Sequence, residues 1–287
     1  MCQHSQGDGG MIDEVQNLTE PIEGCDVLVT GAGRGLGRGI ASFLGQTGAR
    51  LWIVSEVESE LEMTAENIKS KGGWVRTRVT DLTSDSQISD LVKEIKTESG
   101  RLVAIINNAA VLERQSLEQI HKDSWEETLK VNLTTPIFLV RDLIPLLSDR
   151  GGSIINVSSR AGVLGFADQT AYCASKFGIE AFTRCLALEL VGSRISVNSV
   201  TPGLRIKPTS ITEEDAAALE STVRQSWGDP IRLGPAFHLL ACLRGGVSGC
   251  RFDAFTLTNH INEHGLELTA EQLRAIAEYV LPEGGGE

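Results

Sequence analysis

The feature that most constrains the fold is an alternation of short apolar runs with amphipathic helical patterns. The runs are rich in β-branched residues and apolar on both faces, as strands are when helices cover both sides of a parallel sheet. Seven strands are expected, at residues 25–30, 51–55, 74–79, 102–106, 153–158, 195–200 and 250–257. Helical patterns lie between them, for example at 37–47 before Gly48 and at 84–99 before Gly100. The sequence therefore predicts an α/β fold: a doubly wound, mostly parallel seven-stranded sheet with helices on both faces.

The same pattern indicates how the chain is organised. No linker or repeat interrupts the alternation, so we expect one domain over residues 23–287, preceded by a flexible N-terminal tail at 1–22 that is polar and glycine-rich. A helical pattern runs from about Asp123 to Leu147, and Pro136 is expected to kink or split it. Residues 204–230 follow the sixth strand, where an insertion would form a lid over a substrate.

Composition excludes several classes of partner. The net charge of -12 argues against binding to nucleic acid or to an anionic membrane, since both require clustered Lys and Arg. No apolar run approaches the ~18 residues that span a bilayer, and the first ten residues lack the pattern of a signal peptide. The cysteines form no C-x-x-C pair, and no metal-ligand spacing is present. We therefore expect a cytoplasmic protein with reduced thiols and no metal.

A glycine-rich loop follows the first expected strand, with the sequence T-G-A-G-R-G-L-G at residues 30–37. The common G-x-G-x-x-G pattern fits no register of it. Glycines between a strand and a helix nevertheless let backbone amides approach a pyrophosphate at the helix N-terminus. The loop therefore predicts a binding site for a dinucleotide.

The spacing T-G-x-x-x-G-x-G resembles that of the short-chain dehydrogenase/reductase family, and other motifs follow in that family's order. They are Asp81-Leu82, N-N-A-A at 107–110, Asn132 in K-V-N-L, Ser159 in I-N-V-S-S, the Y-x-x-x-K of Tyr172 and Lys176, and Pro202-Gly203. The resemblance covers about residues 25–257 and implies a Rossmann-like fold that binds NAD(P). With the glycine loop, these motifs make up the expected cofactor-binding set: Gly31, Arg34, Gly35, Leu36, Gly37, Ser55, Glu56, Asp81, Leu82, Asn108, Tyr172, Lys176, Pro202 and Gly203.

The pair of Tyr172 and Lys176 has a chemical reason for its spacing. A free tyrosine, with a pKa near ~10, is a poor base at neutral pH. An ammonium four residues later on the same helical face favours the phenolate, and a lower pKa makes the phenol a useful general acid–base. Ser159 can hydrogen-bond the same substrate oxygen. The resemblance also implies that Lys176 holds the nicotinamide ribose and that Asn132 positions a water in a proton relay, which completes the catalytic set.

We therefore expect an oxidoreductase that moves a hydride between NAD(P) and a secondary alcohol or ketone. One alternative is a dinucleotide-binding regulatory protein without turnover, although such a protein would be free to lose the catalytic set. A second alternative is an epimerase or dehydratase of the wider superfamily. Those enzymes usually carry a larger C-terminal substrate domain, for which 287 residues leave little room.

The choice of cofactor depends on the end of the second strand, where the family often has an acidic residue. This chain has Ser55 there, with Glu56 one place later. A carboxylate at this point accepts from the 2′-hydroxyl of NAD and repels the 2′-phosphate of NADP. Arg34 in the glycine loop favours NADP, whereas Glu56 and Glu58 favour NAD. NAD is preferred on this balance, with NADP as the alternative.

Two further expectations concern the substrate and the assembly. Arg205 and Lys207 form a basic pair in the lid, either as solvated charges or as the binding site of an anionic substrate group. The helices that contain Asn132 and Tyr172 carry apolar residues over more of their circumference than contact with one sheet can bury. A homodimer or homotetramer is therefore expected. Residues 258–287 lack the family's Asp-Gly-Gly ending, and this C-terminal segment is therefore atypical.

Overall fold

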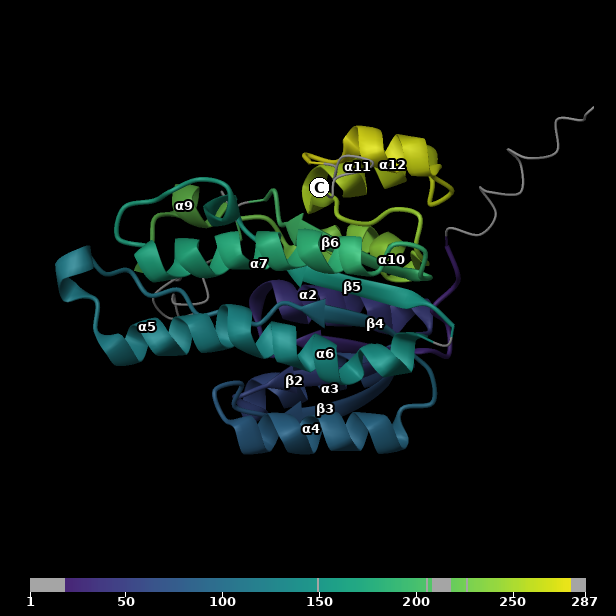
Figure 1. The fold of residues 1–287 in the computed structure, drawn as a ribbon, viewed down its shortest axis with the longest axis horizontal. Coiled ribbons are helices and arrows are strands. Elements are labelled where there is room, and N and C mark those ends of the chain that lie inside the picture. Colours follow the sequence, from purple (N-terminus) through teal and green to yellow (C-terminus); the bar gives the residue numbers. More distant parts are fainter. Residues whose placement is uncertain (1–18, 149, 205, 208–217, 226, 280–287) are drawn as a thin grey trace, which may run out of the picture.

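The computed structural model describes residues 19–148, 150–204, 206–207, 218–225 and 227–279. Within these residues a single sheet has the strand order β3-β2-β1-β4-β5-β6-β7 (Figure 1). Its strands are β1 (Asp26–Thr30), β2 (Arg50–Ser55), β3 (Trp74–Val79), β4 (Leu102–Asn107), β5 (Gly152–Val157), β6 (Ile195–Thr201) and β7 (Arg251–Asp253). Every neighbouring pair is parallel. The predicted doubly wound, seven-stranded α/β fold is confirmed.

Helices cover both faces of the sheet, and each face has its own apolar cluster. One layer contains α2 (Gly35–Leu44), α3 (Glu58–Ser70), α10 (Gly234–Cys242) and α11 (Ala254–His264). The other contains α4 (Asp85–Glu98), α6 (Thr135–Ser148) and α7 (Thr170–Glu189), which lie in front of the sheet in Figure 1. The central strands β1, β2, β4, β5 and β6 are buried on both sides because each supplies side chains to both clusters, which explains their continuous apolar runs.

Helix ends follow the signals in the sequence. Gly48 ends the segment after β1 with a φ of 82°, in the left-handed region that glycine adopts without a steric penalty. Ser84 begins α4, and its hydroxyl accepts a hydrogen bond from the backbone of Gln87.

Pro136 splits the long helix, as expected. Helix α5 (Lys122–Leu129) passes into a π-helical turn (Lys130–Thr134), and α6 begins just before the proline. Because proline has no N–H, it cannot donate the next bond of a continuous α-helix, and it is best tolerated in the first turn of a new one.

The last strand is shorter than the prediction of residues 250–257. It ends at Asp253, whose carboxylate accepts a hydrogen bond from the backbone of Thr256 at 2.8 Å. This contact caps the N-terminus of α11, so the apolar residues after Asp253 are helical. A short α12 (Ala270–Ile276) follows, and α9 (Ser221–Gln225) lies within the predicted lid region.

The prediction of a flexible tail through residue 22 is wrong for its last residues. Ile22 is buried, and Thr19 pairs with Leu243. The carboxylate of Glu20 forms an ion pair with Arg101, with an N–O distance of 2.6 Å. Apolar burial and this ion pair therefore attach residues 19–22 to the domain; residues 1–18 lie outside the described part of the chain. Among the helices that the structure describes, none has the length and apolar character needed to cross a membrane.

Candidate active site

A cavity of about 1020 Å³ runs along the carboxyl ends of the central strands. This is the edge at which ligands bind in open parallel α/β sheets. Most of the predicted site residues line it, namely Gly31, Arg34, Leu36, Gly37, Ser55, Glu56, Asp81, Leu82, Asn108, Tyr172, Lys176, Pro202 and Lys207. The predicted residues Gly35, Asn132, Ser159 and Gly203 are not part of its lining, and Arg205 lies outside the described residues.

The glycine loop is packed too closely to carry side chains. A Cβ on Gly31 would lie 2.7 Å from the Cα of Ala109, and one on Gly37 would lie 2.1 Å from the carbonyl oxygen of Gly31. Helix α2 begins at Gly35, and the side chain of Arg34 at its N-cap makes no capping hydrogen bond. The first N–H groups of α2 therefore face the loop without a side-chain acceptor, and this backbone cradle fits the pyrophosphate of a dinucleotide.

Asn108 holds the ends of two neighbouring strands together. Its side-chain amide donates to the carbonyl oxygens of Thr30 at 2.9 Å and Gly31 at 3.1 Å. Its backbone N–H donates to the hydroxyl of Thr30 at 3.0 Å. The N-N-A-A motif thus sets the shape of the glycine loop from the end of β4.

Carboxylates surround the end of β2. Glu56 lines the cavity, and Glu60 on α3, which the sequence analysis did not single out, lines it as well. Glu60 forms an ion pair with Arg34, with an N–O distance of 3.6 Å. Part of the positive charge of Arg34 is therefore already balanced within the protein.

Lys176 and Tyr172 lie on one face of α7. The ammonium of Lys176 is 5.6 Å from the centre of the Tyr172 ring and donates to the carbonyl oxygen of Val157 at 2.8 Å. Lys176 is 2% exposed, and burial lowers its pKa to about 8, although the negative charge of Glu180 opposes this effect. The hydrogen bond from the Lys176 ammonium to Val157 thus links α7 to the end of β5.

Burial also raises the pKa of Tyr172, while a hydrogen bond with Ser159 opposes the rise. The sequence predicted a lowered pKa, caused by the ammonium of Lys176. That direction is wrong for the protein alone because the loss of hydration of a buried phenolate outweighs the favourable contacts. The Ser159 hydroxyl accepts a bond from the backbone of Ala161 at 3.1 Å, which fixes its oxygen beside the ring.

Asn132 is 1% exposed, and its side chain binds neighbouring chain segments. Its amide donates to the carbonyl oxygen of Val111 at 2.8 Å and to the hydroxyl of Ser175 at 3.1 Å. Its oxygen accepts from the backbone of Val111 at 2.7 Å. Asn132 therefore connects the loop after β4 to α7; its placement of a water stays a prediction.

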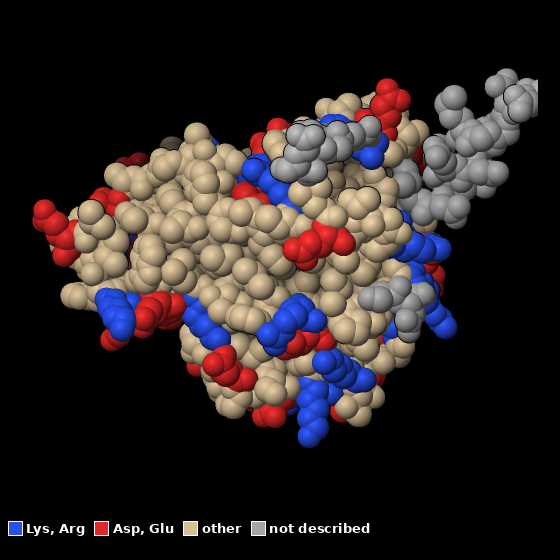
Figure 2. Space-filling view, in the orientation of Figure 1, with Lys and Arg blue, Asp and Glu red and all other residues tan. Residues whose placement is uncertain are grey.

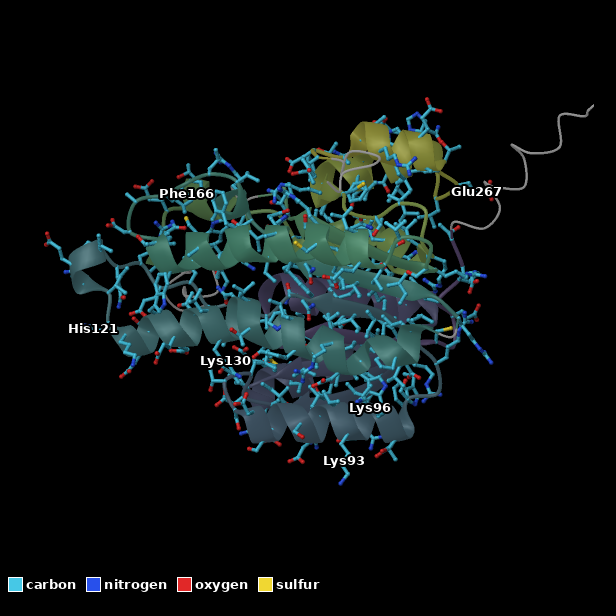
Figure 3. All side chains as sticks on the ribbon, in the orientation of Figure 1. Lys93, Lys96, His121, Lys130, Phe166 and Glu267 are labelled. Atoms are coloured by element: carbon cyan, nitrogen blue, oxygen red, sulfur yellow. The ribbon has the colours of Figure 1, made fainter. Side chains whose placement is uncertain are left out.

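Another group of cavity residues belongs to no motif recognised in the sequence. These residues lie on the loop after β4, the π-helical turn, α5 and the start of the lid. They are Val111, Leu112, Asp123, Glu126, Glu127, Lys130, Val131, Thr134 and Ile206. The one signal for the turn was Pro136, since Lys130 to Thr134 bulge out where that proline interrupts the helix. Figure 3 shows Lys130 where α5 meets α6, and its ammonium forms an ion pair with Asp85. No cluster of three or more His, Cys, Asp or Glu residues suited to a metal occurs among the residues with described positions.

Comparisons with known proteins agree with this geometry. The model of the short chain dehydrogenase family matches residues 26–219. The chain is 33% identical over 225 residues to a 3-oxoacyl-acyl-carrier-protein reductase of Vibrio harveyi, covering 77% of this chain and 91% of the relative. It is 36% identical over 179 residues to a galactitol 2-dehydrogenase of Agrobacterium fabrum, covering 62% and 69% of the two chains.

Solved structures show the same likeness. A carveol dehydrogenase from Mycobacterium avium in complex with NAD aligns with a TM-score of 0.70 at 26% identity, over 82% of this chain and 98% of that one. A short chain dehydrogenase from Shigella flexneri, described as putative and complexed with NADP, aligns with a TM-score of 0.71 at 27% identity, over 82% and 99%.

The fold and the cavity define a nicotinamide-dinucleotide-dependent oxidoreductase. The chain belongs to the short-chain dehydrogenase/reductase family. The resemblance inferred from its motifs is confirmed.

Proposed function

We propose that this protein moves a hydride between NAD(P) and the carbon of a secondary alcohol or ketone, with Tyr172 as the general acid–base. The observation that carries the proposal is that Tyr172 lies between Ser159 and Lys176 at the carboxyl edge of the sheet. Tyr172 and Lys176 also line the cavity that begins at the glycine loop. A substrate oxygen placed there would meet a proton donor and a hydrogen-bonding hydroxyl.

In the direction of reduction, bound NAD(P)H would supply the hydride to the carbonyl carbon. Tyr172 donates its proton to the carbonyl oxygen as negative charge develops there, and Ser159 donates a hydrogen bond to the same oxygen. Burial raises the pKa of Tyr172, so the phenol is protonated and available as the donor at neutral pH, and the charge of Lys176 would stabilise the phenolate that is left. In the direction of oxidation, Tyr172 accepts the proton of the alcohol.

Lys176 is proposed to serve both the cofactor and the tyrosine. An ammonium has three N–H donors, and Val157 takes one of them. The other two can donate to the hydroxyls of the nicotinamide ribose. With a pKa of about 8, Lys176 is mostly charged at neutral pH and favours the phenolate of Tyr172 during oxidation.

We further propose that NAD is the preferred cofactor. Glu56 and Glu60 both line the cavity beside Ser55, and Glu60 already pairs with Arg34. A 2′-phosphate placed there would face two carboxylates and an arginine whose charge is partly balanced. A free 2′-hydroxyl can instead donate to either carboxylate.

The test is to follow nicotinamide absorbance with NAD(H) and NADP(H) against a panel of substrates. The panel contains a 3-oxoacyl thioester and a polyol, after the two relatives, together with simple secondary alcohols and ketones. Turnover by the wild type that Tyr172→Phe abolishes would support the proposal. Tight cofactor binding with no turnover on any substrate would favour a regulatory protein. Product formation without net change in absorbance would favour an epimerase.

A further inference from the structure

An arginine from the last strand is buried beneath the candidate active site. Arg251 on β7 forms an ion pair with Glu180 on α7, and the two side chains are 4% and 3% exposed. Two buried charges lose their hydration, and their mutual attraction compensates only when further hydrogen bonds satisfy both groups. The acceptors of the remaining guanidinium N–H groups therefore show which segments of the chain this ion pair holds in place.

Those donors reach the loop that carries Ser159. The Arg251 Nη2 donates to the carbonyl oxygen of Ser159 at 3.0 Å, and its Nη1 donates to the hydroxyl of Ser158 at 3.2 Å. Its Nε pairs with Glu278 at 2.8 Å. One planar guanidinium thus contacts the end of β5, helix α7 and the C-terminal segment, and such a fork fixes orientation as well as distance.

Glu180, the other member of the ion pair, lies on the face of α7 that also carries Tyr172 and Lys176. Tyr172, Lys176 and Glu180 are spaced by four residues, so they follow one another along that face. The loop after Ser159 packs directly on Glu180, because a Cβ on Gly162 would lie 3.0 Å from the Glu180 Cγ and 2.7 Å from the Ser158 Oγ. The carboxylate also accepts from the Ser199 hydroxyl at 2.9 Å.

We propose that Arg251 is a positioning residue, which holds the backbone of Ser159 against the helix that carries Tyr172 so that the Ser159 hydroxyl meets the phenol. This inference rests on the proposed function of Tyr172 and Ser159, and it adds that their alignment depends on the Arg251–Glu180 pair. Without the guanidinium, the Ser159 carbonyl keeps only the local donor N–H of Gly162, at 2.9 Å, and the loop loses its link to β7. A small displacement of a catalytic hydroxyl is costly because the reaction depends on near-contact geometry.

The test uses the full-length protein and removes both charges together. The variant is Glu180→Gln with Arg251→Met. Removal of Arg251 alone would leave the buried Glu180 with only Arg184, at 3.9 Å, as a charged partner among the described residues. Removal of Glu180 alone would leave the buried Arg251 with only Glu278, so either single change would destabilise the fold strongly. The matched control is Arg244→Met. Arg244 is also 3% exposed, hydrogen-bonded to carbonyl groups and paired with a carboxylate. Its partners are Ala241, Leu243 and, at 3.8 Å, Glu20, and none of them lines the cavity.

The first readout is turnover, with kcat and the cofactor Kd measured separately. We expect the double variant to lose about tenfold or more in kcat while the cofactor Kd changes less than about threefold. Arg244→Met should lower the melting temperature by a similar amount but keep its kcat. An unchanged kcat in a folded double variant, or an equal loss of kcat in the control, would overturn the proposal.

The second readout does not need turnover. The chain has two tyrosines, Tyr172 and Tyr279, so fluorotyrosine labelling gives two ¹⁹F signals, which Tyr279→Phe assigns. Because the bond with Ser159 lowers the pKa of Tyr172, loss of alignment should raise the pH at which its signal titrates in the double variant and not in Arg244→Met. A shift without wild-type turnover on any substrate would support the positioning role while the proposed function fails. No shift would overturn the positioning role whatever the activity.

Discussion

The ammonium of Lys176 lies 5.6 Å from the centre of the Tyr172 ring, one turn further along the same helix. Its own contact is to the carbonyl oxygen of Val157 rather than to the phenol oxygen. Burial therefore controls the protonation of both residues. It raises the pKa of Tyr172, which is protonated at neutral pH, and it lowers the pKa of Lys176 to about 8. This arrangement gives each residue a separate experimental signature.

Removal of the phenolic oxygen should abolish turnover and leave cofactor binding intact. In Tyr172→Phe the ring still packs against its neighbours, and only the transferable proton is lost. We expect kcat to fall on the order of a thousandfold, as for other general acid–base groups. Single-turnover kinetics and fluorescence titration with NADH would separate the two effects. Near-wild-type kcat in Tyr172→Phe would contradict the mechanism.

Burial of Lys176 should make part of the stability depend on pH. Its pKa is about 8 in the folded protein, and the ordinary pKa of a lysine in the unfolded chain is 10.5. The unfolded state therefore binds more protons between these values, and stability rises with pH there. We expect the difference in unfolding free energy between wild type and Lys176→Met to shift by ~2 kcal/mol in favour of the wild type from about pH 7 to about pH 9.5. Urea unfolding at both pH values measures this shift.

The matched control for that experiment is Lys93→Met. Lys93 is exposed on α4, where Figure 3 shows it extending away from the helix. It removes an exposed lysine without changing a buried charge, so it shows how far the loss of a lysine by itself alters the pH dependence of the unfolding free energy. A constant difference for Lys176→Met would mean that its folded and unfolded pKa values are the same.

Cofactor preference should respond to the two carboxylates at the end of β2. Glu56→Ala removes one like charge near a 2′-phosphate, and Glu60→Gln also releases Arg34 from its ion pair. Each change should raise kcat/KM for NADP relative to NAD by about fivefold or more, and the double change by more than either. Glu58→Ala is the control because Glu58 is exposed on the same helix and does not line the cavity. A wild type that already prefers NADP would refute the choice of NAD.

Lys207 lines the cavity beside Ile206, so its role in substrate binding can be tested directly. If its ammonium receives an anionic substrate group, Lys207→Met should raise KM for acidic substrates by roughly tenfold, the equivalent of ~1.4 kcal/mol. Neutral substrates should change little. An equal change for both kinds would place Lys207 on the cofactor, and no change would leave it as a surface charge.

The apolar surface over α6 and α7 predicts self-association. Phe138, Phe177 and Leu188 are each more than 40% exposed, and Figure 2 shows few charges over these helices. We expect a dimer or tetramer by light scattering at micromolar concentration, and a smaller species for Leu188→Glu. Met63→Glu is the control, since Met63 is also exposed, at 52%, and lies on α3 across the sheet. A monomeric wild type would contradict this expectation.

The order of strands and helices could be predicted because it depends on local patterns. Apolar runs, the glycine loop and the caps at Gly48 and Ser84 each act within a few residues of their own position. The errors occurred where a contact outweighed such a pattern. Asp253 caps a helix inside a run whose pattern predicts a strand. Ile22 is buried in the apolar core although it belongs to a segment whose composition predicts a flexible tail.

By itself the sequence determined the family, the sheet and the motif residues that line the cavity, because these follow from motifs at constant spacing. Only the tertiary structure decided the electrostatics of the site. Burial raises the pKa of Tyr172 and lowers that of Lys176. The four-residue spacing of the pair in the sequence does not reveal how much hydration each group loses on folding. The same holds for Arg251 and Glu180, which are 71 residues apart in the chain. Each looks like a solvated charge until folding brings both into one buried contact.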